Sequence, residues 1–131
     1  MYLENNKLLY IFSIYNSIPN NNNLCRDLQN LIRGISNDNY FLIGGDFNAK
    51  HISWNNYNNN TNGIQLRQWL NDKCFLIKQF SSTHPTYVAG SRESWIDFFL
   101  ISMNLNINYP TNRHLKVLDF ESDHKAVKLI I

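Results

Sequence analysis

The segment Phe41-Leu-Ile-Gly-Gly-Asp-Phe-Asn-Ala-Lys-His51 joins a strand signal to polar residues placed directly behind it. The apolar run at 40–43 predicts a buried strand, which the two following glycines are expected to break. Asp46 and Asn48 come next with one residue between them, so strand alternation would point both to the same side. A carboxylate beside a carboxamide can hold a water and a phosphoryl oxygen together. A glycine turn in which Asp46 and Asn48 cap backbone groups is the alternative.

A second carboxylate and an imidazole occur much later in the sequence. Residues 94–102 predict a strand that is almost wholly apolar apart from Asp97, and a buried carboxylate without a partner costs several kcal/mol. His124 is an available partner, and the alternating residues 125–131 behind it predict a terminal strand. If Asp97 binds one imidazole nitrogen, it fixes the tautomer and leaves the other nitrogen for a substrate. The alternative is a satisfied aspartate at a strand edge and a solvent-exposed histidine.

Three motifs, in this order and rough spacing, resemble the endonuclease/exonuclease/phosphatase superfamily, which includes abasic-site endonucleases and DNase I-like nucleases. They are Gly45-Asp46-Phe47-Asn48, Ile96-Asp97 and Ser122-Asp123-His124. Other segments are similar to the endonuclease domain of non-LTR retrotransposons of the jockey type. These are Gly44-Gly45-Asp46-Phe47-Asn48-Ala49-Lys50-His51 with Trp54, Gly63-Ile64-Gln65-Leu66, Thr83-His84-Pro85-Thr86 and Ser91-Arg92-Glu93-Ser94-Trp95-Ile96-Asp97. The resemblance runs from about Leu9 to Ile131.

The resemblance implies an α/β fold, a four-layer α/β/β/α sandwich of two sheets between helices. Family members carry an Asn and a metal-binding Glu several strands before the strand that matches residues 8–15, and Glu4 lies too close to Tyr15 to replace that Glu. We therefore expect residues 1–131 to form one partial domain, the C-terminal half of the sandwich, with a mixed sheet and helices on one face. An uncovered sheet face would make the chain marginally stable or self-associating.

The resemblance also implies divalent-metal-dependent hydrolysis of DNA phosphodiester bonds. Asp46 would orient or deprotonate the attacking water, and Asn48 would hold that water in line. His124, oriented by Asp97, would hydrogen-bond a phosphate oxygen, and Tyr15 would contact the phosphate. This chemistry depends mostly on positioning and electrostatic stabilisation.

Mg²⁺ or Mn²⁺ is the expected cofactor, with Asp46 and Asp123 supporting the metal pocket. The missing glutamate predicts weak or absent activity. His51 and Arg92 are candidate substrate-binding residues beside Asn48; a solvated loop and a surface salt bridge are their respective alternatives. DNA is the expected partner, with a reverse transcriptase in a parent polyprotein. Other readings are a non-catalytic remnant that at most binds nucleic acid, or a phosphatase of the same superfamily.

Composition excludes several classes of protein. The net charge of +2 is too small to identify a nucleic-acid binder, and two isolated cysteines indicate neither a zinc site nor a disulfide framework. No apolar run approaches the roughly 20 residues that span a bilayer, and the first residues do not form a signal peptide. An intracellular location is the default expectation, nuclear for a functional retroelement endonuclease.

The remaining pattern alternates between helices and strands, which indicates a mixed sheet. Apolar spacing predicts helices at 24–32 and at 64–70, the second capped by Thr61 or Asn62. Short strands are expected at 74–77 and from 105, with a turn at 83–86 and a loop at 91–93, and residues 115–120 precede the Ser-Asp-His turn. Asparagine supplies 22 of 131 residues, and the clusters at 20–23 and 55–62 predict solvated loops without packing.

Overall fold

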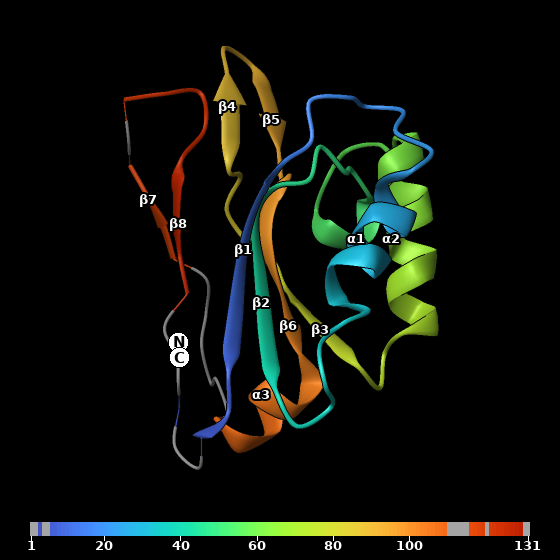
Figure 1. Cartoon of the computed structure of the whole chain (residues 1–131). Coiled ribbons are helices and arrows are strands. Elements are labelled where there is room, and N and C mark those ends of the chain that lie inside the picture. Colours follow the sequence, from blue (N-terminus) through green and yellow to red (C-terminus); the bar gives the residue numbers. More distant parts are fainter. Residues whose placement is uncertain (1–2, 4–5, 110–115, 120, 130–131) are drawn as a thin grey trace.

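The computed structural model describes residues 3, 6–109, 116–119 and 121–129 (Figure 1). Its elements follow in chain order: β1 (Leu9–Tyr15), α1 (Leu24–Ile32), β2 (Tyr40–Asp46), the 3₁₀ helix η2 (Ile52–Trp54), α2 (Thr61–Asp72), β3 (Ile77–Phe80), β4 (Tyr87–Ala89), β5 (Arg92–Ser94), β6 (Asp97–Ser102), α3 (Met103–Asn108), β7 (Lys116–Leu118) and β8 (Ala126–Lys128). Among these residues, no helix is long and apolar enough to cross a membrane.

The central sheet has four strands in the order β1-β2-β6-β3. β1 and β2 run parallel, whereas β6 is antiparallel to both of its neighbours, so the sheet is mixed as predicted. Two hairpins, β4–β5 and β7–β8, form separate two-stranded sheets. The register places Tyr15 opposite Asp46 and Asp46 opposite Asp97, which brings the ends of three strand segments together.

Helices α1 and α2 lie together on one side of the sheet (Figure 1). Their predicted apolar faces pack onto alternate residues of the strands, because side chains of every second strand residue share a face. The resulting core joins both helices to β2, β3 and β6; its fully or nearly fully buried members include Leu28, Ile43, Phe47, Leu66, Phe98 and Leu100. Cys25 of α1 packs against this core, and its burial raises the pKa of the thiol to about 11.

The opposite sheet face is less completely covered. A small cluster of Leu9, Tyr40, Ile101 and Leu105 closes one end of it. The rest borders a cleft of about 330 Å³ lined by apolar side chains that include Ile11, Leu42, Phe99 and Val127. Ile11 is 58% exposed. The strands thus carry apolar residues on both faces, as the sequence predicted, and only one face has a helical layer of α1 and α2.

Several sequence predictions about elements were wrong at their boundaries or in type. β2 does not end at the glycines but continues through them to Asp46, because the Phe99 ring covers Gly44 where a side chain would otherwise stand. Residues 74–76 are a turn, and β3 begins at Ile77. The segment expected as a loop at 91–93 contains β5, which pairs with β4. Residues 94–102 divide between β5 and β6.

The expected strand from residue 105 is instead part of α3. Its alternating sequence fits a strand, but tertiary contacts determine the helix: Leu105 is buried, and the Asn104 carboxamide donates to the carbonyls of Asn37 and Asn39 at 2.8 Å each. This helix lies at the end of the sheet where β2 begins and β6 ends, and Leu105 joins the small cluster there (Figure 1). The predicted terminal strand is confirmed as β8, which is shorter than expected and pairs with β7, a strand that the sequence did not predict; residues 115, 120, 130 and 131 lie outside the described residues.

Candidate active site

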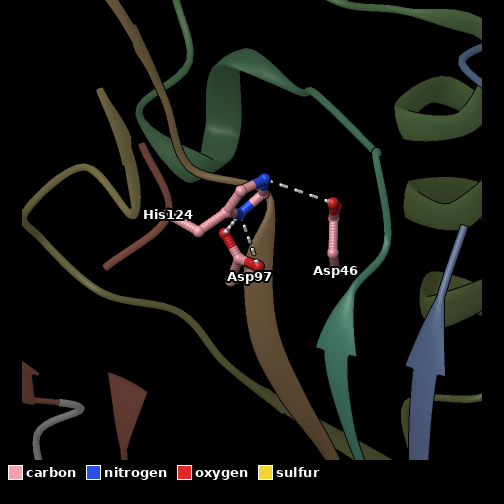
Figure 2. A group of neighbouring side chains, drawn as sticks. All are labelled: Asp46, Asp97 and His124. Carbon is pink, nitrogen blue, oxygen red and sulfur yellow. Dashed lines mark hydrogen bonds and ion pairs between the residues drawn. The ribbon is translucent and has the colours of Figure 1, made fainter. Parts of the chain in front are cut away.

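Three side chains that are far apart in sequence meet at one end of the sheet (Figure 2). Asp46 is the last residue of β2, Asp97 is the first residue of β6, and His124 precedes β8. The two aspartates are direct partners across the β2–β6 ladder. One ligand atom from each residue lies within 4.8 Å of the others. We call Asp46, Asp97 and His124 the carboxylate–imidazole cluster; it contains three of the five side chains that the sequence motifs predicted to meet, the other two being Asn48 and Asp123.

The imidazole of His124 lies between the two carboxylates. Nδ1 is 3.0 Å from Asp97 Oδ2 and 3.2 Å from Oδ1, whereas Nε2 is 3.7 Å from Asp46 Oδ2 (Figure 2). A carboxylate only accepts, so Nδ1 carries the hydrogen toward Asp97. In the neutral ring, Nε2 and Asp46 Oδ2 are then two acceptors facing each other. A water or another donor near both atoms would satisfy them together.

The environment of the two aspartates raises the pKa of both carboxyl groups. Burial raises the pKa of Asp46 above its ordinary value, with a smaller opposing effect from the Asn48 amide and further raising by Asp97. Burial also raises the pKa of Asp97, against the hydrogen bonds from Thr86 and His124. The side chains are 14% and 15% exposed, while that of His124 is 40% exposed. The cluster therefore opens to solvent on the imidazole side.

Two residues behind the cluster were missed by the sequence reasoning. Thr86 is fully buried, and its hydroxyl accepts from the backbone amides of Ile96 at 3.2 Å and Asp97 at 3.1 Å. Its carbonyl accepts from the amide of Lys125 at 2.7 Å. Tyr87 forms a β-bridge with His124 and packs its ring edge-on against the imidazole, with centroids 5.0 Å apart. In the sequence, only the predicted turn at 83–86 pointed to the segment that contains Thr86 and Tyr87.

Asn48 reaches the site by a route that differs from the prediction. Strand alternation does not apply, since the strand ends at Asp46 and Asn48 is left-handed, with φ +47°. The Asn48 amide donates to Asp46 Oδ1 at 2.8 Å. Its carbonyl accepts from the carboxamides of Asn60 and Asn62. The capping alternative is thus correct for one oxygen of Asp46, while Oδ2 still faces His124.

The other predicted site residues lie outside the cluster. Tyr15 is 77% exposed and is the register partner of Asp46. The exposed Asp123 contributes its carbonyl to Val88, and its side chain does not join the cluster. His51 caps η2 and contacts Ser53 Oγ at 2.7 Å. The exposed Arg92 stands at the turn of the β4–β5 hairpin.

The donor atoms of the cluster fit a magnesium ion only in part. Asp97 is occupied by the imidazole and Asp46 Oδ1 by an amide, which leaves Asp46 Oδ2 as the open carboxylate oxygen. Mg²⁺ often binds through one or two carboxylates, with waters and substrate phosphates completing its shell. Asp46 could therefore hold such an ion, with most of the shell supplied by water and substrate.

Comparison with known families decides the affiliation of this chain. The sequence model of the family described as "Endonuclease-reverse transcriptase" matches residues 9–128. The chain belongs to this family. The match spans the four-stranded sheet and all three residues of the carboxylate–imidazole cluster. No curated protein matches the sequence.

Two solved structures match this chain. The endonuclease domain of TRAS1, a telomere-specific non-LTR retrotransposon, is 19% identical with a TM-score of 0.64, over 86% of this chain and 52% of that one. CdtB, the biologically active subunit of cytolethal distending toxin, is 15% identical with a TM-score of 0.48, over 88% and 45%. This chain thus spans about half the length of the structures that it matches. The first similarity supports the predicted α/β fold of this endonuclease family.

Proposed function

We propose that this chain carries the catalytic residues of a retroelement-type endonuclease that hydrolyses DNA phosphodiester bonds with a divalent metal ion. The observation that carries the proposal is the His124 imidazole held between Asp97 and Asp46 at the end of the sheet. The family affiliation and the likeness to the TRAS1 endonuclease domain support the same reading.

Each residue has its own role in the proposed hydrolysis. Asp97 fixes the imidazole of His124 through Nδ1, and with a hydrogen on each ring nitrogen Nε2 donates to a phosphate oxygen of the substrate. Asp46 Oδ2 orients the attacking water and takes up its proton, which the raised pKa of this carboxyl favours. The Asn48 carboxamide holds the water in line, and the exposed Tyr15 contacts the phosphate.

When bound, Mg²⁺ or Mn²⁺ would neutralise charge on the phosphate and on the departing oxygen. Asp46 is the residue that would hold it, and Asp123 could approach only with a change of its side-chain position. With a single open carboxylate oxygen in the described cluster, affinity for the metal is expected to be low and hydrolysis slow. His51 and Arg92 would contact the DNA backbone at the margin of the site.

The decisive experiment is nicking of supercoiled plasmid by the purified chain with Mg²⁺ or Mn²⁺. His124→Ala should slow nicking at least ~100-fold, because it removes the donor to the phosphate. The matched control is His84→Ala, which removes an exposed histidine outside the cluster and should leave the rate unchanged. Nicking that survives His124→Ala would show a contaminating nuclease. DNA binding without nicking would favour a non-catalytic remnant, and release of phosphate from a phosphomonoester would favour a phosphatase.

The cellular setting follows from the same proposal. A retroelement endonuclease acts on chromosomal DNA, which places it in the nucleus. The family description pairs endonuclease with reverse transcriptase, and this supports a parent polyprotein in which a reverse transcriptase accompanies the present chain.

We also propose that the open sheet face mediates self-association. Ile11 is 58% exposed beside the apolar cleft, a surface that soluble monomers usually cover. Sedimentation velocity should show concentration-dependent dimers for the wild type, and Ile11→Ser should shift them toward monomer. Ile64→Ser is the matched control, since Ile64 is 52% exposed on α2, a helix of the opposite layer. A wild type that stays monomeric at all concentrations would contradict the proposal.

A further inference from the structure

The two asparagine-rich segments are not the unpacked loops that the sequence predicted. They meet beside the candidate site, and Asn62, at the start of α2, is fully buried. A buried carboxamide is costly unless its donors and acceptor are all satisfied. The partners of Asn62 therefore show what this residue does.

All three hydrogen bonds of the Asn62 carboxamide connect the start of α2 to two other segments of the chain. Nδ2 donates to the Ile18 carbonyl at 2.7 Å and to the Asn48 carbonyl at 2.9 Å. Oδ1 accepts from the Asn21 amide at 2.7 Å. Two of these partners lie in the segment that follows β1, and the third is the left-handed residue behind Asp46.

Neighbouring bonds extend the same connection. Asn21 donates to Asn16 Oδ1 at 3.2 Å, and Asn16 donates from its side chain to the Phe47 carbonyl and from its amide to the Asp46 carbonyl, both at 2.9 Å. The segment that begins directly after Tyr15 is thus bonded to the backbone carbonyls of Asp46 and Phe47. Asn62 closes this arrangement from the side of α2.

Residues at the start of α2 hold the loop 46–50 at a second point. Asn60 donates to the Asn48 carbonyl at 2.8 Å and accepts from the amides of Lys50 and Gly63. Gly63 lies so close to the Lys50 carbonyl that any side chain there would collide with it. The loop 46–50 is therefore seated on the first turn of α2 by side chains and by a close backbone approach.

We propose that Asn62 is a positioning residue of the candidate site, one that fixes Asn48 relative to Asp46 and to the segment behind Tyr15. This inference rests on the proposed function for its catalytic meaning, but the positioning itself is independent of it. Asparagine is required chemically because two carbonyls need donors and one amide needs an acceptor, with the reach of a short side chain. Aspartate has nearly the same shape and supplies no donor to either carbonyl.

The test compares Asn62→Asp with Asn104→Asp. Asn104 is a matched control because its Nδ2 also donates to two carbonyls and its Oδ1 also accepts from a backbone amide, in α3 at the other end of the sheet (Figure 1). In ¹H–¹⁵N spectra, Asn62→Asp should shift the amides of residues 46–50 and 16–21 and speed hydrogen exchange at Asn48. Asn104→Asp should leave those amides in place.

Kinetics supply the second readout. Asn62→Asp should lower kcat for plasmid nicking by roughly 10- to 100-fold with little change in KM, since misplacement of a reacting group by an ångström has effects of this size. Asn104→Asp should leave both unchanged. If the wild type does not nick DNA, the proposed function fails while the spectra still decide the positioning role.

A milder variant covers the case in which Asn62→Asp does not fold. Asn60→Asp keeps the helix-capping acceptor and removes only the donor to the Asn48 carbonyl. It should shift the amides of residues 48–50 in the same direction by a smaller amount. The proposal would be overturned if the amide chemical shifts of residues 46–50 stayed unchanged in the folded variants. It would also be overturned if Asn104→Asp shifted those amides equally.

Discussion

Replacement of Gly45 by alanine is expected to lower the free energy of unfolding by at least about 3 kcal/mol. Gly45 has φ +139°, a conformation that side chains disfavour, and an added Cβ would collide with the Ile14 carbonyl oxygen of the neighbouring strand. Because the obstacle is backbone within the β1–β2 ladder, the sheet itself must shift. Total stabilities are only about 5–15 kcal/mol, so urea unfolding should show a much lower midpoint or no folded baseline.

Two other glycines separate the contributions to this effect. Gly90→Ala tests positive φ alone, because Gly90 has φ +62° and nothing within 4 Å of an added Cβ; about 1–2 kcal/mol is expected. Gly34→Ala is the control for both positive φ and collision, since Gly34 has open space and no positive φ. Its effect on the free energy of unfolding should be close to zero. An effect of Gly45→Ala no larger than that of Gly90→Ala would contradict the close packing of β1 on β2.

Asp46→Asn is expected to stabilise the chain at neutral pH while slowing nicking at least ~100-fold. Burial is the main cause of the raised pKa of Asp46, so the charged carboxylate is a cost to the folded state. The carboxamide introduced by this substitution still offers an oxygen to the Asn48 amide, which in the wild type donates to Asp46 Oδ1. A carboxamide cannot take a proton from water, and activity is lost for this reason.

The pH dependence of that gain follows from proton linkage. Between the ordinary pKa of 3.8 and the raised pKa, the folded state binds more protons at Asp46 than the unfolded state, so the wild type loses stability as pH rises through this window. The advantage of Asp46→Asn should be complete above the raised pKa and vanish below 3.8. Urea unfolding at neutral and acid pH measures it, with Asp38→Asn, a substitution of an exposed aspartate, as control. Lower stability of Asp46→Asn at neutral pH would contradict the buried-charge argument.

The sequence predicts the cluster well because its residues lie in motifs with strong local character. Asp46 follows an apolar strand, Asp97 is the one charged residue within the apolar part of its predicted strand, and the motif order supplied His124 as a partner; that Asp97 begins its strand was not predicted. The helix at Leu24–Ile32 is confirmed to the residue, since an amphipathic period with Gly34 behind it leaves few alternatives.

The failures arise where long-range contacts override local pattern. Residues 103–108 alternate like a strand, yet Leu105 is buried in a helix. Glycines read as breakers remain in β2 because Phe99 and the β1 backbone fill the space beside them. Asn62 looked like part of a solvated polar tract, and nothing local shows that its carboxamide has three distant partners. Such roles depend on which distant segments are in contact in the fold, and local composition does not show these contacts.

The direct pairing of Asp46 with Asp97 constrains how this gene can change. Loss or gain of one codon within β2 or β6 would rotate one aspartate to the opposite side of the sheet, because strand faces alternate with every residue. The reading frame would survive, and the carboxylate–imidazole cluster would not. By contrast, the β4–β5 turn at Gly90 has free space around it and can absorb such length changes. Insertions and deletions that accumulate in descendants should therefore concentrate at that turn.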